Sequence, residues 1–380
     1  MTEREALVAM NMVTGMGAIT AKRLLERMGS FAAALKATEA ELAAVPSLGE
    51  IKARQFAQDF RTVAFEAEMA RAERLHVRLV TWVDPDYPPT LKQIADPPLV
   101  IYLRGAVEAL NNTCVAIIGT RHATVYGRET ARRFGFQLAG AGYTVVSGLA
   151  TGIDAEAHTG AVQAKGKTVG VLGGALDRFY PKENEALARS IVQNGGAIIS
   201  EYPFGRAPDR QTFPMRNRIV SGLSKGVLVI ESPLASGTMI TVNQALEQNR
   251  VVMAVPGRVD SPASQGCHRL LREGARLVTN ADEVIDELQD LTACMRRETL
   301  SATRPADETP PPEPASARPK PVLTEEERRV YELLTAEGNA VDEIVRASGI
   351  DTGKASSILI GLQIRRLAKA LPGGRVARVP

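Results

Sequence analysis

The sequence predicts an α/β protein in which a central Rossmann-like, doubly wound parallel sheet is flanked by a small all-helical domain and a winged helix. Six short apolar runs alternate with helix-like segments in the middle of the chain. Apolar residues recur at helical spacing before them, and a proline-rich stretch precedes the last segment. The predicted boundaries are 1–75 for a helical domain resembling SAM or helix-hairpin-helix domains, 76–295 for the Rossmann-like domain, 296–321 for a linker, and 322–380 for the winged helix.

The composition argues against several classes of protein. No run of about 18 apolar residues exists, so we expect no membrane span. The N-terminal stretch MTEREALVAM lacks the basic and then apolar pattern of a secretory signal. The three cysteines, Cys114, Cys267 and Cys294, have no metal-ligand spacing, which favours the cytoplasm and predicts no metal or other cofactor. The net charge of +3 is small for a nucleic-acid binder, so a DNA site would have to come from local clusters.

Two similar glycine breaks stand out in the helical domain. Residues 13–17 precede a helix-like segment at 18–25, and residues 45–49 precede another at 50–54. Each break resembles a helix-hairpin-helix, in which a tight glycine turn leads into a helix whose N-terminal amides can face a phosphate. The pattern is equally typical of ordinary helical hairpins with glycine caps, and both interpretations stay open.

The central part predicts a buried parallel sheet. Residues 76–113 are rich in proline and predict an ordered connector or edge-strand region, with a short strand at 99–103. The six apolar runs predict strands at 114–118, 144–146, 168–172, 197–199, 227–230 and 251–255. Ligands of such sheets bind beyond the carboxyl ends of the strands, so the residues directly after each run are the site candidates.

The first strand is followed by Gly119-Thr120-Arg121, and then by Thr124 and Gly127. A dinucleotide site would need glycines in the spacing G-x-G-x-x-G, but Arg121 replaces the second glycine. Glycine amides, threonine hydroxyls and a guanidinium fork together predict a phosphate site rather than a nicotinamide site. The alternative is a tight turn that carries a surface arginine.

The second and third strands lead to further polar turns. Ser147 and Gly148 follow the second strand, and Asp154 and His158 come later on one helix face. A structural hydrogen bond is a better interpretation of Asp154 and His158 than a catalytic or metal-binding pair, because no third ligand is spaced nearby. After the third strand, Lys182 is a candidate phosphate contact. The neighbouring Phe179 or Tyr180 could stack on a base, although a solvated lysine beside packed aromatics fits equally well.

Two more clusters complete the candidate site. Arg216-Asn217-Arg218 precedes an apolar helix and predicts an anion site at its N-terminus, although arginines two apart face different ways and at most one is expected to contact the ligand. Ser236-Gly237-Thr238 forms another turn of amides and hydroxyls. A row of such turns along one sheet edge suits a repeated anionic polymer better than a single mononucleotide.

These residues resemble the DNA-processing protein A family from about Asp86 to Gly274. The resemblance implies a non-catalytic protein that binds single-stranded DNA, protects it and loads RecA recombinase onto it during natural transformation, and that forms a homodimer through its Rossmann-like domain. It also implies DNA contacts from Arg121 and Lys182. His268 and Val242-Asn243 depart from the family pattern. The matching motifs are Tyr87-Pro88, Asp96-Pro97-Pro98, Gly119-Thr120-Arg121, Tyr126-Gly127, Ser147-Gly148-Leu149-Ala150, Gly152-Ile153-Asp154, Ala157-His158, Tyr180-Pro181, Ser200-Glu201, Phe213-Pro214, Arg216-Asn217-Arg218, Ser236-Gly237-Thr238 and Val255-Pro256-Gly257.

The last segment predicts three helices and a hairpin. Thr324 and Glu327 form a capping-box pattern, a second helix is expected at 341–346, a third begins after Asp351, and residues 371–376 suit a hairpin. The third helix carries Arg365, Arg366 and Lys369 only near its end, which favours a protein-contact module over a duplex-reading one.

Two other functions stay open on the sequence alone. A nucleotide-processing enzyme of the phosphoribohydrolase type would use Glu201 or Glu231 as its acid, but Ala235-Ser236 stands where such enzymes have a glycine pair. A transcriptional regulator would read duplex DNA through the winged helix and use the central domain as a ligand sensor.

Overall fold

The computed structural model describes residues 1–289, 323–335, 338–364, 367–371 and 375–378. The chain divides into two compact units, Met1–Thr303 and Arg304–Pro380, which are considered separately. Cys294 and the predicted linker at 296–321 lie outside the described residues.

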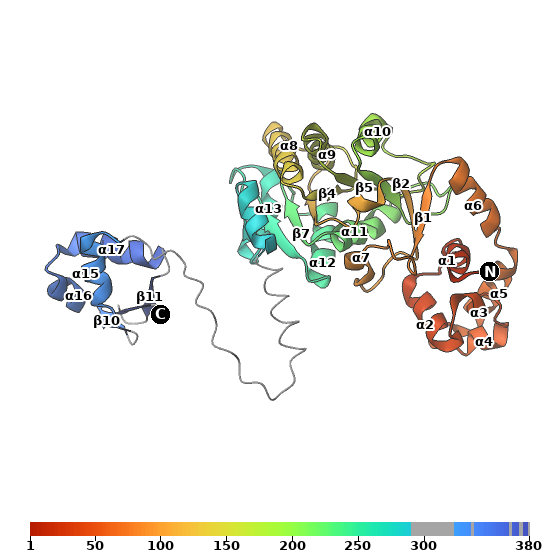
Figure 1. Cartoon of the computed structure of the whole chain (residues 1–380), viewed down its shortest axis with the longest axis horizontal. Coiled ribbons are helices and arrows are strands. Elements are labelled where there is room, and N and C mark those ends of the chain that lie inside the picture. The colour runs from red at the N-terminus through yellow and green to blue at the C-terminus, as the bar shows by residue number, and fades with distance from the viewer. Residues whose placement is uncertain (290–322, 336–337, 365–366, 372–374, 379–380) are drawn as a thin grey trace. The chain divides into compact units, whose positions relative to one another are not determined.

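The N-terminal part of the first unit is helical, as predicted (Figure 1). Capping boxes at Thr2 and Thr38 begin two of its helices. The two glycine breaks precede α2 and α5, where Gly17 is the N-cap of α2 and Gly49 is the first residue of α5. The helices are α1 (Glu3–Asn11), α2 (Ala18–Met28), α3 (Phe31–Ala34), α4 (Glu39–Ala43), α5 (Gly49–Thr62) and α6 (Phe65–Arg74).

A nine-stranded sheet forms the centre of the first unit, in the order β1-β2-β6-β5-β4-β3-β7-β8-β9. The six predicted strands are confirmed as β3 (Cys114–Ile118), β4 (Thr144–Ser147), β5 (Thr168–Val171), β6 (Ala197–Ser200), β7 (Gly226–Val229) and β8 (Val251–Ala254), all parallel to their neighbours among these six. The proline-rich region supplies the edge, as β1 (Arg78–Thr81) and β2 (Val100–Gly105), and β2 runs antiparallel to β6. The sequence did not predict β9 (Arg276–Leu277).

Helices cover both faces of the sheet, so the doubly wound topology is confirmed. The side chains of β3 point alternately to the two faces. On one face, Val115 and Ile117 pack with α8 (Val125–Gly140) and α9 (Ile153–Gln163), and α10 (Glu185–Gln193) lies beside α9. Ala116 and Ile118 pack with α11 (Thr212–Leu223), α12 (Gly237–Glu247) and α13 (Gln265–Arg272). The short helix α7 (Pro89–Lys92) lies against α11. β4, β5 and β6 lie on one side of β3, and β7 and β8 lie on the other, so the switch point of the sheet is between the carboxyl ends of β3 and β7.

The N-terminal helices and the sheet share one hydrophobic core. Leu24 and Phe31 from the helices belong to the same buried cluster as Val100 and Tyr102 from β2. Polar contacts join the two parts as well, since the Tyr102 hydroxyl donates to a Glu68 carboxylate oxygen at 2.9 Å. The helical domain is therefore an integral part of the first unit.

The second unit is the predicted winged helix. It contains α15 (Glu325–Glu332), α16 (Val341–Ser348) and α17 (Thr352–Ile364), and a small sheet of β10 (Asn339–Ala340), β12 (Arg375–Arg378) and β11 (Ala368–Leu371). The Thr324 and Glu327 capping box is confirmed. Arg365, Arg366 and the turn at 372–374 lie outside the described residues, as does the side chain of Lys369, so the preference for a protein-contact module stays a prediction.

Within the described part of the chain, no helix combines the length and the apolar character needed to cross a membrane. Nor does any group of three or more His, Cys, Asp or Glu side chains in those residues come together in a way that could hold a metal ion.

Candidate nucleic-acid interface

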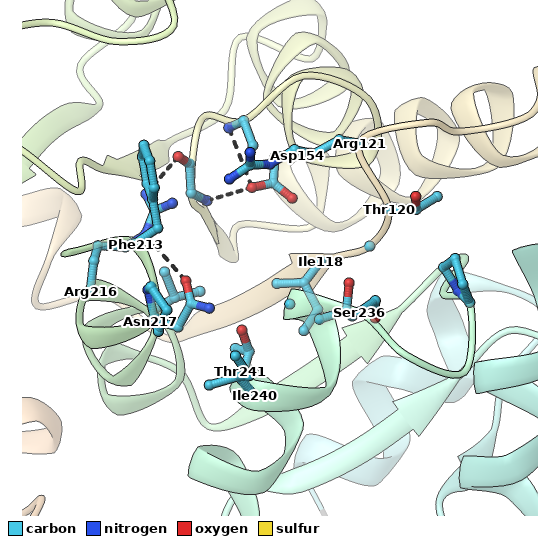
Figure 2. Close-up of a pocket in the computed structure, with 18 of the residues that line it drawn as sticks. Ile118, Thr120, Arg121, Asp154, Phe213, Arg216, Asn217, Ser236, Ile240 and Thr241 are labelled. Atoms are coloured by element: carbon cyan, nitrogen blue, oxygen red, sulfur yellow. Dashed lines mark hydrogen bonds between the residues drawn. The ribbon is translucent and has the colours of Figure 1, made fainter. Parts of the chain in front are cut away.

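A cavity of about 500 Å³ opens at the switch point, where the turns after β3, β4 and β7 meet α11 (Figure 2). We call it the Arg121 cavity. The structure brings many of the predicted residues to its wall. They are Gly119, Thr120, Arg121, Gly148, Arg216, Asn217, Ser236, Gly237 and Thr238. Figure 2 shows residues of α11 on one side of the cavity and Ser236 on the other.

Arg121 is the exposed cation of the first turn. Its guanidinium carbon lies 5.2 Å from the centre of the Phe213 ring. Among the described residues, no acidic side chain lies within ion-pair distance of Arg121, so its charge faces the cavity without a partner. The turn beneath it is fixed, because the Thr120 amide donates to the Glu231 carbonyl at 2.8 Å. A Cβ atom at Gly119 would come within 2.5 Å of the Ile153 side chain, so glycine serves close packing here.

Thr124 and Gly127 form hydrogen bonds and close contacts within the protein. The Thr124 hydroxyl donates to Glu231 at 2.6 Å and accepts from the Gly127 amide at 3.1 Å, which caps α8. The Thr124 amide donates to the same carboxylate at 3.0 Å, and a Cβ atom at Gly127 would collide with it. Glu231 is only 2% exposed. The two predicted DNA contacts stay predictions, although both residues already have a buried carboxylate, distant in sequence, as their neighbour.

Ser147 is also internal. It is fully buried, and its hydroxyl donates to the Ile117 carbonyl at 2.6 Å. It therefore joins β4 to β3 and does not reach the cavity. Gly148, the next residue, does line the cavity. Glycine is needed there because any side chain would overlap the Arg216 guanidinium.

Arg216 forms part of the cavity floor and is 4% exposed. It donates to the carbonyl of Gly148 at 2.6 Å and to that of Val171. Burial lowers the pKa of its guanidinium to about 10, so it stays charged at neutral pH. Burial likewise raises the pKa of the Asp154 carboxyl, and the charge of Arg216 opposes that rise. The Arg216 guanidinium therefore places a positive charge beneath the cavity, and Asp154 partly balances that charge.

Arg216 lies in the second turn of α11, because that helix begins at Thr212, and not at the helix N-terminus as predicted. The residues before the helix include Arg210, an exposed cation that lines the Arg121 cavity. Asp209 does not neutralise it, because Asp209 pairs with Arg206 at 2.6 Å and accepts from the Thr212 amide. Sequence reasoning missed Arg210 and the cavity-facing position of Phe213. A cation three residues before an aromatic residue, at the start of a helix, could have indicated both positions.

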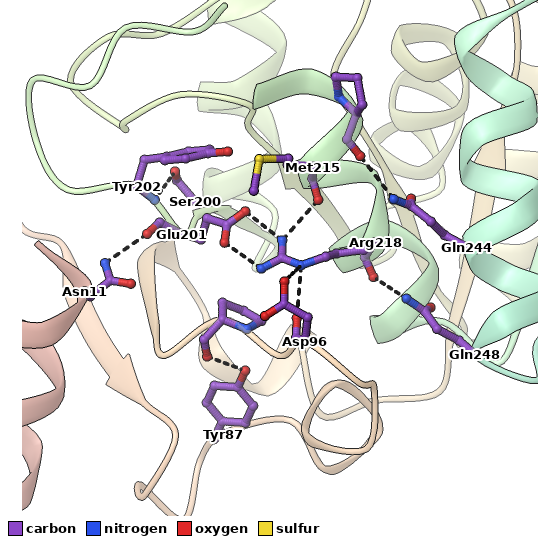
Figure 3. A network of polar contacts seen from close by, with 12 residues as sticks. Asn11, Tyr87, Asp96, Ser200, Glu201, Tyr202, Met215, Arg218, Gln244 and Gln248 are labelled. Carbon is purple, nitrogen blue, oxygen red and sulfur yellow. Dashed lines mark hydrogen bonds and ion pairs between the residues drawn. The ribbon is translucent and has the colours of Figure 1, made fainter. Parts of the chain in front are cut away.

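Arg218 does not line the Arg121 cavity and lies instead in a network of polar contacts (Figure 3), so its predicted DNA contact stays a prediction. It donates two hydrogen bonds of 2.7 Å to the Glu201 carboxylate, one of 3.0 Å to the Asp96 carbonyl and one of 3.2 Å to the Asp96 carboxylate. Its side chain is only 12% exposed. Burial alone would lower its pKa, but the Glu201 carboxylate more than offsets this and raises the pKa. We call Arg218, Glu201 and Asp96 the Arg218 network.

The start of α12 gives the cavity its second anion-binding feature. Ser236 is the N-cap, and its hydroxyl bonds to that of Ser232 at 2.8 Å rather than to the helix. The amides in the first turn of a helix have no partner within it, so those of Gly237 and Thr238 are available to an anion. A Cβ atom at Gly237 would meet nothing within 4 Å, which shows that this helix start is open.

Asp154 and His158 make separate hydrogen bonds within the protein, which fits the structural interpretation. Asp154 accepts from the Gly148 amide at 3.1 Å, whereas the fully buried His158 bonds through Nδ1 to the Thr168 hydroxyl at 2.7 Å. Burial lowers the pKa of His158 to about 3, and the Arg216 charge acts in the same direction. Glu201 and Glu231, the acids expected of a phosphoribohydrolase, are held by Arg218 and Thr124, and neither lines the Arg121 cavity.

Residues 78–289 match the family model of DNA recombination-mediator protein A, which is more than half of the chain. The chain belongs to this family. The DprA winged helix domain matches residues 310–374, and a SAM-like helix-hairpin-helix tandem matches residues 8–62. These matches confirm the family suggested by the sequence motifs. The tandem match favours the helix-hairpin-helix interpretation of the two glycine breaks.

Relatives of this family resemble the chain along most of its length. Protein Smf of Synechocystis is 32% identical over 395 residues, covering 99% of each protein. The X-ray structure of DNA processing protein A from Streptococcus pneumoniae covers 76% of this chain and 98% of that chain, with a TM-score of 0.65 and 31% identity. A Helicobacter pylori DNA processing protein A structure, whose subject is a single-stranded DNA binding mode, covers 57% and 97%, with a TM-score of 0.51 and 31% identity.

The two departures from the family pattern fit local packing in this family member. The His268 ring bonds through Nε2 to the Gly257 carbonyl at 3.0 Å. Val242 is 1% exposed and belongs to the core beneath α12. Neither residue lines the Arg121 cavity.

Lys182 is not part of the Arg121 cavity either. It lines a second cavity of about 890 Å³, which we call the Tyr180 cavity. A small pocket of about 130 Å³, the connecting pocket, shares Arg121 and Phe213 with the first cavity and Tyr180 with the second, and Glu183 also lines it. The rings of Tyr180 and Phe213 are 5.8 Å apart.

Proposed function

We propose that this chain binds single-stranded DNA in the Arg121 cavity without catalysing a reaction on it. The observation that carries the proposal is the exposed guanidinium of Arg121, which has no acidic partner among the described residues and lies over the Phe213 ring at the sheet's switch point. The single-strand binding mode of the Helicobacter pylori relative supports it.

Each part of the cavity suits one part of a nucleotide. Arg121 offers a guanidinium fork to a phosphate, and the open amides of Gly237 and Thr238 offer a second anion site across the cavity. Phe213 offers an aromatic face, which accepts any base by stacking. Arg216 adds positive potential from below, while Gly119, Thr120, Gly148, Asn217 and Ser236 shape the wall. A phosphate–base alternation fits this arrangement better than a compact mononucleotide.

The finer role follows the family resemblance. We propose that the bound strand is incoming DNA in the cytoplasm, that the protein protects it and loads RecA recombinase onto it during natural transformation and recombination, and that it acts as a homodimer through the Rossmann-like domain. Binding the backbone and the base faces without reading base edges supports this role, because a protective binder must accept any sequence.

Reversal of one charge tests the proposal. Arg121→Glu places a negative charge where a phosphate would lie, so we expect the affinity for a fluorescent oligothymidylate to fall at least 100-fold, equivalent to about 2.7 kcal/mol. Lys167→Glu is the matched control, because Lys167 is exposed and lies just before β5, at the opposite edge of the sheet. Fluorescence anisotropy at two salt concentrations measures both. Unchanged binding by Arg121→Glu, with the same melting temperature as the wild type, would refute the proposal.

A further inference from the structure

The loop that precedes α11, residues 202–211, leads directly to two residues of the Arg121 cavity. Arg210 stands near its end, and Phe213 follows in the first turn of α11. Every residue of the loop is exposed or half-buried, so the loop has no core of its own to fix its shape. The positions of both side chains therefore depend on the contacts that hold the 202–211 loop.

Helix α6 of the helical domain holds this loop through Glu68. Oε1 of Glu68 accepts the Phe204 amide at 2.8 Å and the Tyr102 hydroxyl at 2.9 Å. Glu68 is only 6% exposed, so water competes little for these two hydrogen bonds. The rings of Tyr102 and Phe204 also meet edge to face, with their centres 5.2 Å apart. Glu68 thereby ties the first half of the loop to both α6 and β2.

Arg71 holds the next residue of the loop from the same face of α6, because it lies three residues after Glu68. The Arg71 guanidinium donates to one carboxylate oxygen of Asp177 at 2.7 Å, and the other oxygen accepts the Gly205 amide at 2.9 Å. The guanidinium carbon lies 5.3 Å from the centre of the Phe204 ring. One face of α6 thus fixes two consecutive residues of the loop.

Further hydrogen bonds continue from this anchored point to the cavity. The Arg206 carbonyl accepts the Ala175 amide at 2.9 Å, and the Asp209 carboxylate accepts the Thr212 amide at 2.9 Å. These bonds fix the direction in which the chain enters α11, and with it the place of Arg210.

We propose that Glu68 is a positioning residue for single-strand binding. By holding the 202–211 loop, it keeps Arg210 and Phe213 at the Arg121 cavity, although Glu68 itself lines neither of the two large cavities. The inference rests on the proposed function. It gives the helical domain a part in DNA binding that needs no contact between Glu68 and the strand.

The sign of the effect separates this role from general electrostatics. Glu68→Ala removes a negative charge, which by itself strengthens the attraction of an anionic strand. Loss of the anchor instead weakens one base contact and one phosphate contact, so we expect the affinity for an oligothymidylate of about 16 nucleotides to fall about tenfold. The log–log salt slope should become shallower by about 0.7, the value for the phosphate contact of Arg210. Glu73→Ala, which removes an exposed acid from the same helix, is the matched control and should bind at least as tightly as the wild type.

A conservative variant separates positioning from a simple loss of stability. The amide oxygen of Glu68→Gln can accept the same two hydrogen bonds, so its affinity should lie within about twofold of the wild type. Hydrogen exchange followed by mass spectrometry should rise in the 202–211 loop of Glu68→Ala and stay unchanged in the parallel strands. If Glu68→Ala does not fold, Phe204→Leu takes its place. This change removes the ring contacts but no charge, and should weaken binding about threefold.

The outcomes distinguish this inference from the proposed function. If Arg121→Glu loses binding while Glu68→Ala binds like Glu73→Ala, the positioning role is refuted and the proposed function stands. Equal losses in Glu68→Ala and Glu68→Gln, with faster exchange throughout the sheet, would show general destabilisation and would also overturn the inference. If Arg121→Glu binds like the wild type, the proposed function fails, and this inference fails with it.

Discussion

The Arg121 cavity and the Arg218 network contain the same kind of side chain in opposite states. Arg121 and Arg210 are exposed, with no acidic partner among the described residues, whereas Arg218 is almost buried and bonded to Glu201 and Asp96. An arginine that already holds two carboxylates has few donors left for a phosphate. The difference teaches that the partners of a cation, more than its place in a motif, decide whether it is available to DNA.

The largest expected effect comes from breaking the Arg218 network. Arg218→Ala leaves Glu201, whose side chain is only 14% exposed, without its partner, so we expect the free energy of unfolding to fall by about 3–5 kcal/mol. Arg206→Ala, which removes an exposed pair with Asp209, should cost about 0–1 kcal/mol. Urea unfolding followed by fluorescence of Trp82, the single tryptophan, measures both.

A compensated variant sharpens the same comparison. Arg218→Met/Glu201→Leu replaces the main ion pair with apolar side chains, which often restores stability. Once folded, this variant should bind single-stranded DNA like the wild type, because neither residue lines the Arg121 cavity. A selective loss of DNA affinity in a stable variant would show that Arg218 contributes to DNA binding.

The second effect concerns His158, a buried residue of α9. His158 has a folded pKa of about 3, below its usual value near 6.5, so it is neutral in the native state. Its contribution to stability is fully present above pH 6.5 and is lost as the pH falls, because the unfolded chain then binds the proton. We expect a loss of about 1.6 kcal/mol between pH 6.5 and pH 5 from this residue.

Urea midpoints over this pH window test the assignment. His158→Gln should flatten that part of the stability profile, whereas His122→Gln, at an exposed position, should keep the slope of the wild type. Equal slopes for the wild type and His158→Gln would show that His158 does not stay neutral on folding.

The sequence predicted the sheet well because buried strands and their turns have strong local signals. All six apolar runs became strands, since a strand covered on both faces needs apolar side chains at every position. The strand β9 was missed because both of its residues are exposed, so it has no such pattern. The capping box at Thr324 is likewise a local signal, and it was found.

The site could be predicted only in part because several of its predicted members have partners that are distant in the sequence. Thr124 and Gly127 meet Glu231, which is more than 100 residues away, and Arg218 meets Asp96 across 122 residues. Contacts between residues so far apart cannot be predicted from the spacing of residues in the sequence. The partner of Ser147 was equally hidden from the sequence, since its acceptor at Ile117 lies on the neighbouring strand.

The smallest effect tests the cation that the sequence analysis missed. Arg210→Ala removes one exposed charge from the rim of the Arg121 cavity, so we expect a loss of about 0.5–1 kcal/mol in single-strand affinity. The salt slope should become shallower by about 0.7, the value for one phosphate contact with a single strand. Arg206→Ala is the neighbouring control, because Arg206 is paired with Asp209 and does not line the cavity. If both variants change the slope equally, general charge near α11 attracts the strand; a change in Arg210→Ala alone would show that the unpaired cation contacts a phosphate directly.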